Sequence, residues 1–329
     1  MKTFLKSKNR FFPLFLGLLF LFPFSFFSCA SQAASAEEYF SIGMAYYELG
    51  KFAEAEKWLN RARAINRTMV ASEYNLGRIA FETGRYEEAA EHFERILRRD
   101  PGNVMALQAA AYARIKNGDM EEAEALYARV LELVPEEADS GYNYALVLYT
   151  MEKYAQGEEV LLKYPYALEE NQDSLLLLAR TQKALDKVEA VDNYAKWLGA
   201  APQAVPQVLY EYAQVLEAAS FYARALEQYR AAAAALQTDT ETLKKSGLRF
   251  ETARLLFTAD SGNDEGIVEL DAAVAEGFAD TEALEKLLDD SRISEAHKDA
   301  IRGAVEKIRN PPVNADSADD ADSVEETED

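Results

Sequence analysis

The chain repeats itself at intervals close to 34 residues, and this periodicity constrains its fold more than any other feature of the sequence. Segment 50–55 recurs as 84–89 and as 118–123, beginning each time with glycine and ending with alanine. The small residue that ends the segment falls at Ala55, Ala89, Ala123, Gly157, Ala190, Ala225 and Gly266. These positions are 34, 34, 34, 33, 35 and 41 residues apart, so the sequence predicts serial copies of one structural unit.

Each unit has the pattern of two amphipathic helices joined by a tight turn. In the second unit, apolar residues recur at helical spacing through 71–83 and again through 87–98. Gly84 ends the first of these helices and Pro101 follows the second, as helix-terminating residues do.

Small residues are expected where the two helices of a unit cross. A larger side chain at the crossing would force the two backbones apart, because protein interiors are close-packed. We therefore expect Gly43 and Gly77, on first helices, to lie against Ala55 and Ala89 on second helices.

This arrangement resembles the tetratricopeptide repeat family, whose unit is a hairpin of two helices. In the family's frame, the second unit matches the signature at Leu76, Gly77, Phe81, Tyr86, Ala89, Phe93 and Pro101. The resemblance extends from about residue 37 to about residue 275. It implies an all-α fold, an α-solenoid of about six to seven helix hairpins.

The C-terminal part is predicted to close the solenoid and then to continue as a tail. Segments 281–288 and 294–308 have helical patterns, with Ser294 placed as an N-cap, and are expected to be C-terminal capping helices. The predicted solenoid with its cap therefore spans 37–308. Residues 309–329 are predicted to be a disordered acidic tail, since eight acids and no base follow residue 310.

The N-terminus is predicted to be a lipoprotein signal peptide covering 1–28. A basic segment, an apolar run from 11 to 27 and a series of small residues follow one another in the order of an export signal. The residues Ser28 and Cys29 resemble a bacterial lipobox, which implies cleavage before Cys29 and its modification with palmitate. Two alternatives are an ordinary signal cleavage near Ala33 or Ala34, and an uncleaved membrane anchor.

A lipidated Cys29 would attach the protein to a membrane through a short tether, 29–36. The seven residues from 30 to 36 span at most ~25 Å when fully extended. The resemblance to bacterial lipoproteins implies a place in the cell envelope, facing the periplasm. Because Ala30 follows Cys29, without the aspartate that retains some lipoproteins at the inner membrane, the outer membrane is preferred.

Composition excludes several classes of function. Beyond residue 28 there are 31 bases and 57 acids, a charge that repels nucleic acid. One cysteine and two histidines, His92 and His297, cannot form a multi-Cys or multi-His metal site, and no cofactor is expected. His92, beside Glu88 and Glu91, is expected on the solvated surface. Segment 260–266 is expected to be a plain turn, because its spacing does not match a calcium loop.

Function is expected on the concave surface, which the first helices of the repeats line in this family. In the later repeats, the family's groove positions are polar, as at Gln214. In the earlier repeats, the same positions predict a partner-binding groove formed by Phe40, Met44, Tyr47, Tyr74, Arg78, Phe81, Tyr112, Tyr142, Leu146 and Tyr149. An aromatic wall of this kind suits an extended peptide or an amphipathic helix. The alternative is that aromatics such as Phe81 belong to the core between helices. Arg78 could pair with an acid of the partner, but pairing with Glu82 one turn away is favoured.

The sequence carries no catalytic motif, so it predicts that the protein is not an enzyme. The predicted function is a membrane-anchored scaffold for protein–protein interaction in cell-envelope assembly, serving outer-membrane protein, pilus or cell-wall machinery. The alternative function is an accessory subunit associated with a substrate-binding protein of a solute transporter. That alternative predicts a pore or pocket in the solenoid able to pass a small ligand.

Overall fold

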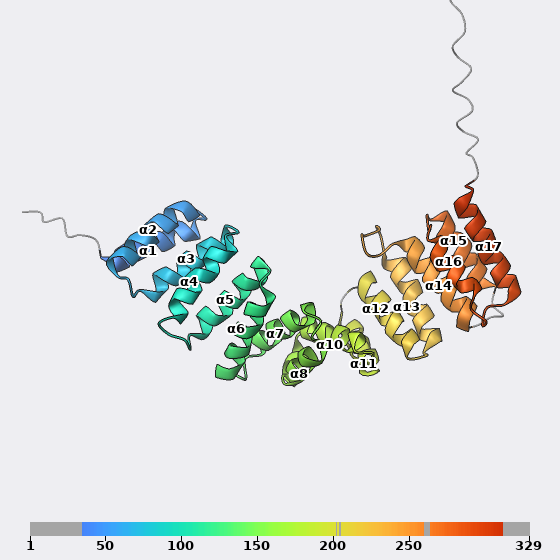
Figure 1. The fold of residues 1–329 in the computed structure, drawn as a ribbon, viewed down its shortest axis with the longest axis horizontal. Coiled ribbons are helices and arrows are strands. Elements are labelled where there is room, and N and C mark those ends of the chain that lie inside the picture. The colour runs from blue at the N-terminus through green and yellow to red at the C-terminus, as the bar shows by residue number, and fades with distance from the viewer. Residues whose placement is uncertain (1–34, 202, 204, 260–263, 312–329) are drawn as a thin grey trace, which may run out of the picture. The chain divides into compact units, whose positions relative to one another are not determined.

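The structure, a computed structural model, describes residues 35–201, 203, 205–259 and 264–311 (Figure 1). Over these residues it consists of helices joined by turns, without a β-strand. The helices are α1 (Ala36–Glu48), α2 (Phe52–Ile65), α3 (Val70–Glu82), α4 (Tyr86–Leu97), α5 (Val104–Asn117), α6 (Met120–Leu133), α7 (Ala138–Thr150), α8 (Tyr154–Leu162), α9 (Pro165–Glu170), α10 (Gln172–Ala184), α11 (Glu189–Ala200), α12 (Pro206–Ala218), α13 (Tyr222–Ala235), α14 (Lys245–Ala259), α15 (Glu265–Ala275), α16 (Thr281–Leu288) and α17 (Glu295–Arg309). Cys29, the predicted signal peptide and residues 312–329 of the predicted tail lie outside the described residues.

The chain divides into two compact units at the first turn of α3, between Ser72 and Glu73. The first unit contains the hairpin of α1 and α2. A capping box starts α1, in which the Ser35 hydroxyl accepts from the Glu38 amide and the Glu38 carboxylate accepts from the Ser35 amide. Leu59 of α2 is fully buried against Gly43 of α1.

In the second unit, helices that follow one another in sequence pack against one another. Contacts join α4 to α5, α5 to α6, α6 to α7, α12 to α13 and α13 to α14. Each hydrophobic cluster draws on neighbouring hairpins; one combines Tyr194 of α11, Tyr212 of α12, Tyr229 of α13 and Leu255 of α14. Serial packing of this kind confirms the predicted all-α solenoid.

The turns between paired helices keep a strict 34-residue spacing. Gly50, Gly84 and Gly118 have positive φ values of 70°, 76° and 93°, in the left-handed region that glycine adopts without a steric penalty. At the next three multiples of 34, the same conformation is held by other residues, Glu152 (φ 58°), Asp186 (φ 54°) and Ser220 (φ 65°). The turn geometry therefore continues through six repeats although its glycine is lost after the third.

The small residues of the first helices make close contacts with large side chains of the second helices. A Cβ atom added to Gly77 would lie 2.7 Å from Phe93 Cε1, and one added to Gly43 would lie 2.8 Å from Leu59 Cγ. The side chains nearest to these glycines, Leu59 and Phe93, lie one helical turn beyond Ala55 and Ala89 on the second helices. The alanines are fully buried nonetheless.

The hairpin of α14 and α15 has the same contact with the large and small residues exchanged. In α14 and α15 the large residue comes first, and a Cβ added to Gly266 would lie 2.6 Å from Phe257 Cε1. The space beside Gly141 of α7 is occupied by the ring of Tyr164, the residue before the short helix α9. Helix α9 begins with Pro165 and was not expected from the repeat pattern.

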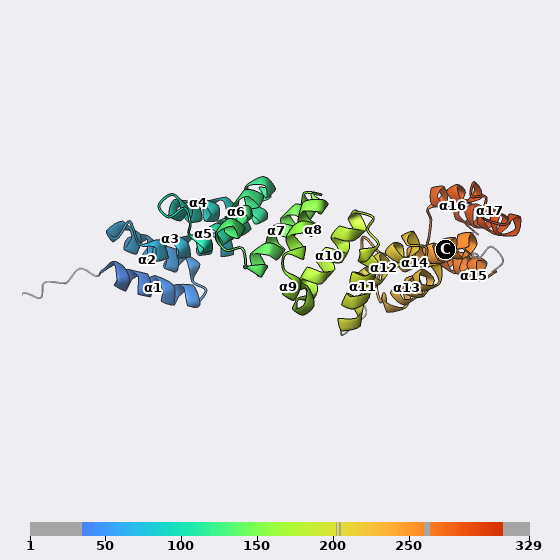
Figure 2. The same cartoon turned by 90° about the horizontal axis from the view of Figure 1, so that it is seen from below.

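At the C-terminal end, α17 packs against both α15 and α16 (Figure 2). Leu284 and Leu287 of α16 and Ile301 of α17 share a hydrophobic cluster with Phe250 and Phe257 of α14. The Ser294 hydroxyl accepts from the His297 amide at 3.2 Å, which is the N-cap predicted from the sequence. These two helices thus cover the apolar surface of the last hairpin.

The glycine contacts lead to a paired prediction for stability. We expect Gly77→Ala to destabilise the protein by about 1–3 kcal/mol, because its Cβ would overlap the ring of Phe93. At Gly157 the nearest atom to an added Cβ is the Ala145 carbonyl oxygen at 3.5 Å, an ordinary contact. Gly157→Ala should therefore stabilise the protein by up to about 1 kcal/mol, since alanine is the better helix former. Urea unfolding of both variants measures the difference; an equal loss in both would contradict the packing role of Gly77.

Candidate functional site

Four of the residues predicted to form a binding groove line one cavity in the second unit. Tyr74, Arg78 and Phe81 of α3 and Tyr112 of α5 surround a space of about 500 Å³. Met105, Gln108 and Ala109 of α5 and Asn143 of α7 complete its walls with Glu82, Phe93 and Tyr127. We call this space the aromatic cavity. Its volume is within the range of ~300–1,000 Å³ that is usual for ligand pockets.

Stacked rings form the wall of the aromatic cavity. The rings of Phe81 and Tyr112 lie 5.1 Å apart at an interplanar angle of 28°, and the Tyr74 ring lies 5.3 Å from Phe93. Tyr112 remains 44% exposed and Met105 remains 62% exposed, so both can be reached from solvent. Lys116 places its ammonium 5.5 Å from the centre of the Tyr112 ring. The cavity therefore offers apolar surface with a cation at its edge.

Phe81 satisfies both of the interpretations that the sequence left open. Its side chain packs against the core cluster of α4, α5 and α6, and it also lines the aromatic cavity. Arg78 donates from Nη1 to Oδ1 of Asn75, on the same helix, at 3.1 Å.

The predicted residues of α7 do not line the aromatic cavity. Tyr142 and Tyr149 are half-buried against the cluster formed by α7, α8 and α10, and burial raises the pKa of both phenols. Leu146 is 38% exposed. In the first unit, Phe40, Met44 and Tyr47 are half-buried, and the Tyr47 ring lies 5.6 Å from Phe52.

The expected surface position of His92 is wrong. Its side chain is buried, and its Nδ1 lies 2.7 Å from Oε1 of Glu73, which α3 places 19 residues earlier in the chain. Arg95 donates to the same Glu73 oxygen at 2.9 Å. The acidic neighbours of His92 on its own helix suggested solvent, whereas a carboxylate from the preceding helix supplies the buried partner.

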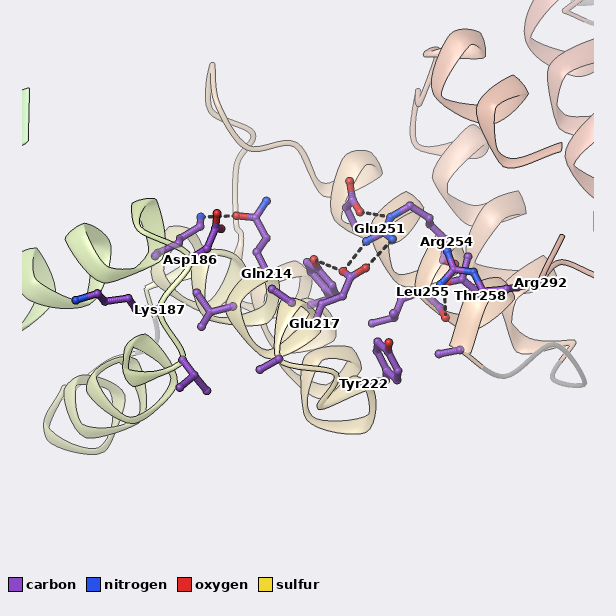
Figure 3. A pocket seen from close by; sticks show the side chains of 17 residues that line it. Asp186, Lys187, Gln214, Glu217, Tyr222, Glu251, Arg254, Leu255, Thr258 and Arg292 are labelled. Carbon is purple, nitrogen blue, oxygen red and sulfur yellow. Dashed lines mark hydrogen bonds and ion pairs between the residues drawn. The ribbon is translucent and has the colours of Figure 1, made fainter. Parts of the chain in front are cut away.

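A larger cavity of about 960 Å³ lies between later repeats of the second unit (Figure 3). We call it the polar cavity. Its walls come from the end of α10, from α12, α13 and α14, and from Arg292 in the turn before α17. Of its lining residues, only Gln214 was among the groove positions considered from the sequence.

Arg254 organises the polar cavity by binding two carboxylates. It lies between Glu217 and Glu251 (Figure 3), donating from Nη1 and Nη2 to Glu217 at 2.7 and 2.6 Å and from Nε to Glu251 at 2.7 Å. The Tyr229 hydroxyl donates to Glu217 at 3.0 Å. Burial opposes the charge of Arg254, but these bonds to Glu217 and Glu251 raise its pKa above the ordinary value. The guanidinium thus joins α12 to α14 across one repeat.

Lys183, at the end of α10, also places a cation in the wall of the polar cavity. It is half-buried and donates to the uncharged amide oxygen of Gln214. Burial lowers the pKa of Lys183, because an ammonium ion is less well solvated there than in water. With this lysine, the Gln214 amide and the exposed carboxylate of Asp186, the cavity could hold a polar ligand through hydrogen bonds and charge.

Neither cavity has the groups that a metal ion would need. Among the described residues there is no cluster of three or more His, Cys, Asp or Glu side chains placed to hold a metal. None of the helices within the same residues combines the length and the low polarity required to cross a bilayer.

Comparisons with known proteins place the chain among tetratricopeptide repeat sequences. Two family models described as tetratricopeptide repeat match residues 40–104 and 80–140. A tetratricopeptide repeat protein from Parabacteroides merdae has a similar solved structure, with a TM-score of 0.51 and 17% identity over 84% of this chain and 99% of that one.

Two relatives are similar in sequence. A protein of Treponema pallidum (strain Nichols) described as an uncharacterized lipoprotein is 28% identical over 172 residues, which cover 52% of this chain and 88% of the relative. The Drosophila melanogaster protein O-mannosyl-transferase Tmtc3 is 26% identical over 151 residues, 44% of this chain but 16% of that protein.

The ion pairs of the polar cavity provide a stability prediction. Arg254→Met should destabilise the protein by about 1.5–3 kcal/mol, because Glu217 and Glu251 would lose their charged donor at a partly buried site. Arg292→Met, in the wall of the same cavity, should cost no more than about 0.5 kcal/mol, since Arg292 is 63% exposed in its pair with Asp290. Thermal unfolding of both variants tests this; equal effects would show that Arg254 does not hold the repeats together.

Proposed function

The chain is a tetratricopeptide repeat protein, and on that premise we propose that it is a lipid-anchored scaffold that binds a protein partner at the aromatic cavity. The observation that carries the proposal is the stack of Phe81 and Tyr112, open to solvent through the exposed faces of Tyr112 and Met105. Aromatic side chains bury a large area with few rotatable bonds, and partly exposed ones are typical of contact surfaces.

The partner that fits the aromatic cavity is a polypeptide segment with one or more large apolar side chains. Such a side chain would pack between Tyr74, Phe81 and Tyr112. The amides of Gln108 and Asn143 also line the cavity and can bond to the partner's backbone or polar groups. Helix-in-groove binding and binding of an extended peptide both meet these requirements.

A lipid anchor at Cys29 is part of the proposal. It rests on the lipobox-like sequence and is supported by the relative from Treponema pallidum that is described as a lipoprotein. Attachment by several acyl chains would hold the protein stably, whereas a single chain gives marginal binding. We assign the protein to the periplasmic face of the cell envelope, at the outer membrane in preference to the inner one, in the assembly of outer-membrane proteins, pili or the cell wall.

We infer that the protein works by binding and not by catalysis. The aromatic cavity holds no side chain arranged as a nucleophile beside a base. In the polar cavity, Arg254 is committed to ion pairs with Glu217 and Glu251.

The polar cavity favours a second candidate function, that of an accessory subunit associated with a substrate-binding protein of a solute transporter. That function requires space for a small ligand, and the cavity of about 960 Å³ provides it. Crosslinking in the native envelope separates the two candidates: recovery of a solute-binding protein favours the transport role, and recovery of assembly or cell-wall factors favours the scaffold.

Partner binding can be tested with two tyrosines that differ in position. A photocrosslinking amino acid at position 112 should capture the partner, because Tyr112 is exposed at the aromatic cavity. The same amino acid in place of Tyr166, which is 80% exposed and outside the cavity, is the control. Tyr112→Ala should reduce partner recovery by about tenfold or more, as loss of a buried aromatic anchor does, and Tyr166→Ala should not. Equal capture from both positions would contradict binding at the aromatic cavity.

Lipidation can be tested separately at the cysteine. Cys29→Ser should abolish metabolic labelling with palmitate and release the protein from the membrane fraction, since no other cysteine is present. Labelling and fractionation with detergent measure the two effects. Unchanged labelling of the variant would refute the anchor at this residue without affecting the proposed binding site.

A further inference from the structure

The charge of the chain is distributed unevenly about the boundary between its two units. Residues 35–72 contain five bases and five acids, whereas residues 73–329 contain 26 bases and 52 acids. The negative charge of the protein is therefore carried by the second unit. An anionic lipid surface would repel the second unit, whereas it would exert no net repulsion on the first unit.

The first unit presents an aromatic and cationic stack close to its N-terminal end. The rings of Tyr39 in α1 and Trp58 in α2 are stacked, with centroids 5.5 Å apart and an interplanar angle of 22°. The Arg61 guanidinium lies 4.5 Å from the Trp58 ring centre and 5.9 Å from that of Tyr39. Arg61 is exposed, and both rings are half-exposed. Tryptophan, tyrosine and arginine in this combination have an apolar body and a polar or charged end, which suits the boundary between lipid headgroups and hydrocarbon.

Exposed aliphatic residues continue this surface along α1. Ile42 is 38% exposed and Leu49, directly after the helix, is 69% exposed. At 100° per residue, both lie within about 80° of Tyr39 around the helix axis. Glu37 and Glu48 fall on the opposite side of α1. Glu38 lies about 100° from Tyr39, on the same side as Leu49, and its carboxylate accepts from the Ser35 amide in the capping box.

We propose that the surface formed by Tyr39, Ile42, Leu49, Trp58 and Arg61 rests on the phospholipid bilayer, with Arg61 against anionic headgroups. This proposal rests on the proposed anchor, because a lipidated Cys29 would be seven residues from Ala36 and keep α1 within ~25 Å of the membrane. The anchor raises the local concentration of the bilayer, and a surface too weak to bind membranes alone can then remain in contact with them.

The experiment uses the two tryptophans of the chain. Trp197→Phe leaves Trp58 as the single tryptophan, and it removes no hydrogen bond, because Trp197 Nε1 is buried without a partner among the described residues. The protein anchored through Cys29 is placed on vesicles of phosphatidylethanolamine and phosphatidylglycerol whose acyl chains are brominated near the headgroup. We expect the bromines to quench about half of the Trp58 emission, since an interfacial surface enters the bilayer by ~5–10 Å.

Matched variants identify the surface responsible. Leu49→Glu and Arg61→Glu should each lower the quenching at least about threefold, because they add a carboxylate to the surface facing anionic lipid. Val268→Glu, at a residue of α15 that is 66% exposed, should leave it unchanged. Circular dichroism verifies that all variants keep their helical content. Absence of quenching, or equal quenching in all three variants, would overturn the proposal.

The anchor and the surface can fail independently. Mass spectrometry of the purified protein first establishes whether Cys29 carries lipid. If it does not, the proposed anchor is refuted, and the Cys29 thiol of a chain starting at that residue is coupled to a maleimide lipid, which restores the same tether. The quenching experiment then proceeds unchanged and decides the membrane contact by itself.

Discussion

The close approach of paired helices is the contact on which the structure depends. It is made where a glycine of one helix receives a large side chain of the other, as Gly43 does with Leu59, Gly77 with Phe93 and Gly266 with Phe257. No single hairpin can bury its remaining apolar face, so each hairpin contributes side chains to a cluster shared with the next. The glycine contacts hold the two helices of each hairpin together, and the shared hydrophobic clusters hold successive hairpins together.

Much of this fold could be predicted because its signals are local. A glycine that ends a helix, a proline that prevents its continuation and apolar residues at helical spacing all act within a few residues of one another. Their recurrence gives the hairpins, and Ser294 gives the start of the last helix. The close contact of Phe93 with Gly77 was not predicted, because it depends on where along their lengths the two helices cross.

The site was less predictable, since its interactions join separate repeats. The buried His92 contacts the carboxylate of Glu73, and Arg254 forms an ion pair with Glu217, which is 37 residues away in the sequence. Pairs at such separations have no signature in a single sequence, whereas a pair four residues apart on a helix does. For the same reason Tyr74, Phe81 and Tyr112 could be placed on one wall by family position, but the sequence did not separate them from Tyr142 and Tyr149, which pack into the core of a neighbouring repeat.

The left-handed turns at Glu152, Asp186 and Ser220 have an energetic consequence. A residue with a Cβ in this conformation costs about 1–2 kcal/mol relative to glycine, so three successive central turns carry a penalty that the first three avoid. In a series of units stabilised by their neighbours, hydrogen exchange of the amides around these turns should be faster than around Gly84 and Gly118. The polar cavity is lined by Asp186 and by Ala219, which precedes Ser220, so a molecule bound there would lie beside two of these three turns and should slow their exchange.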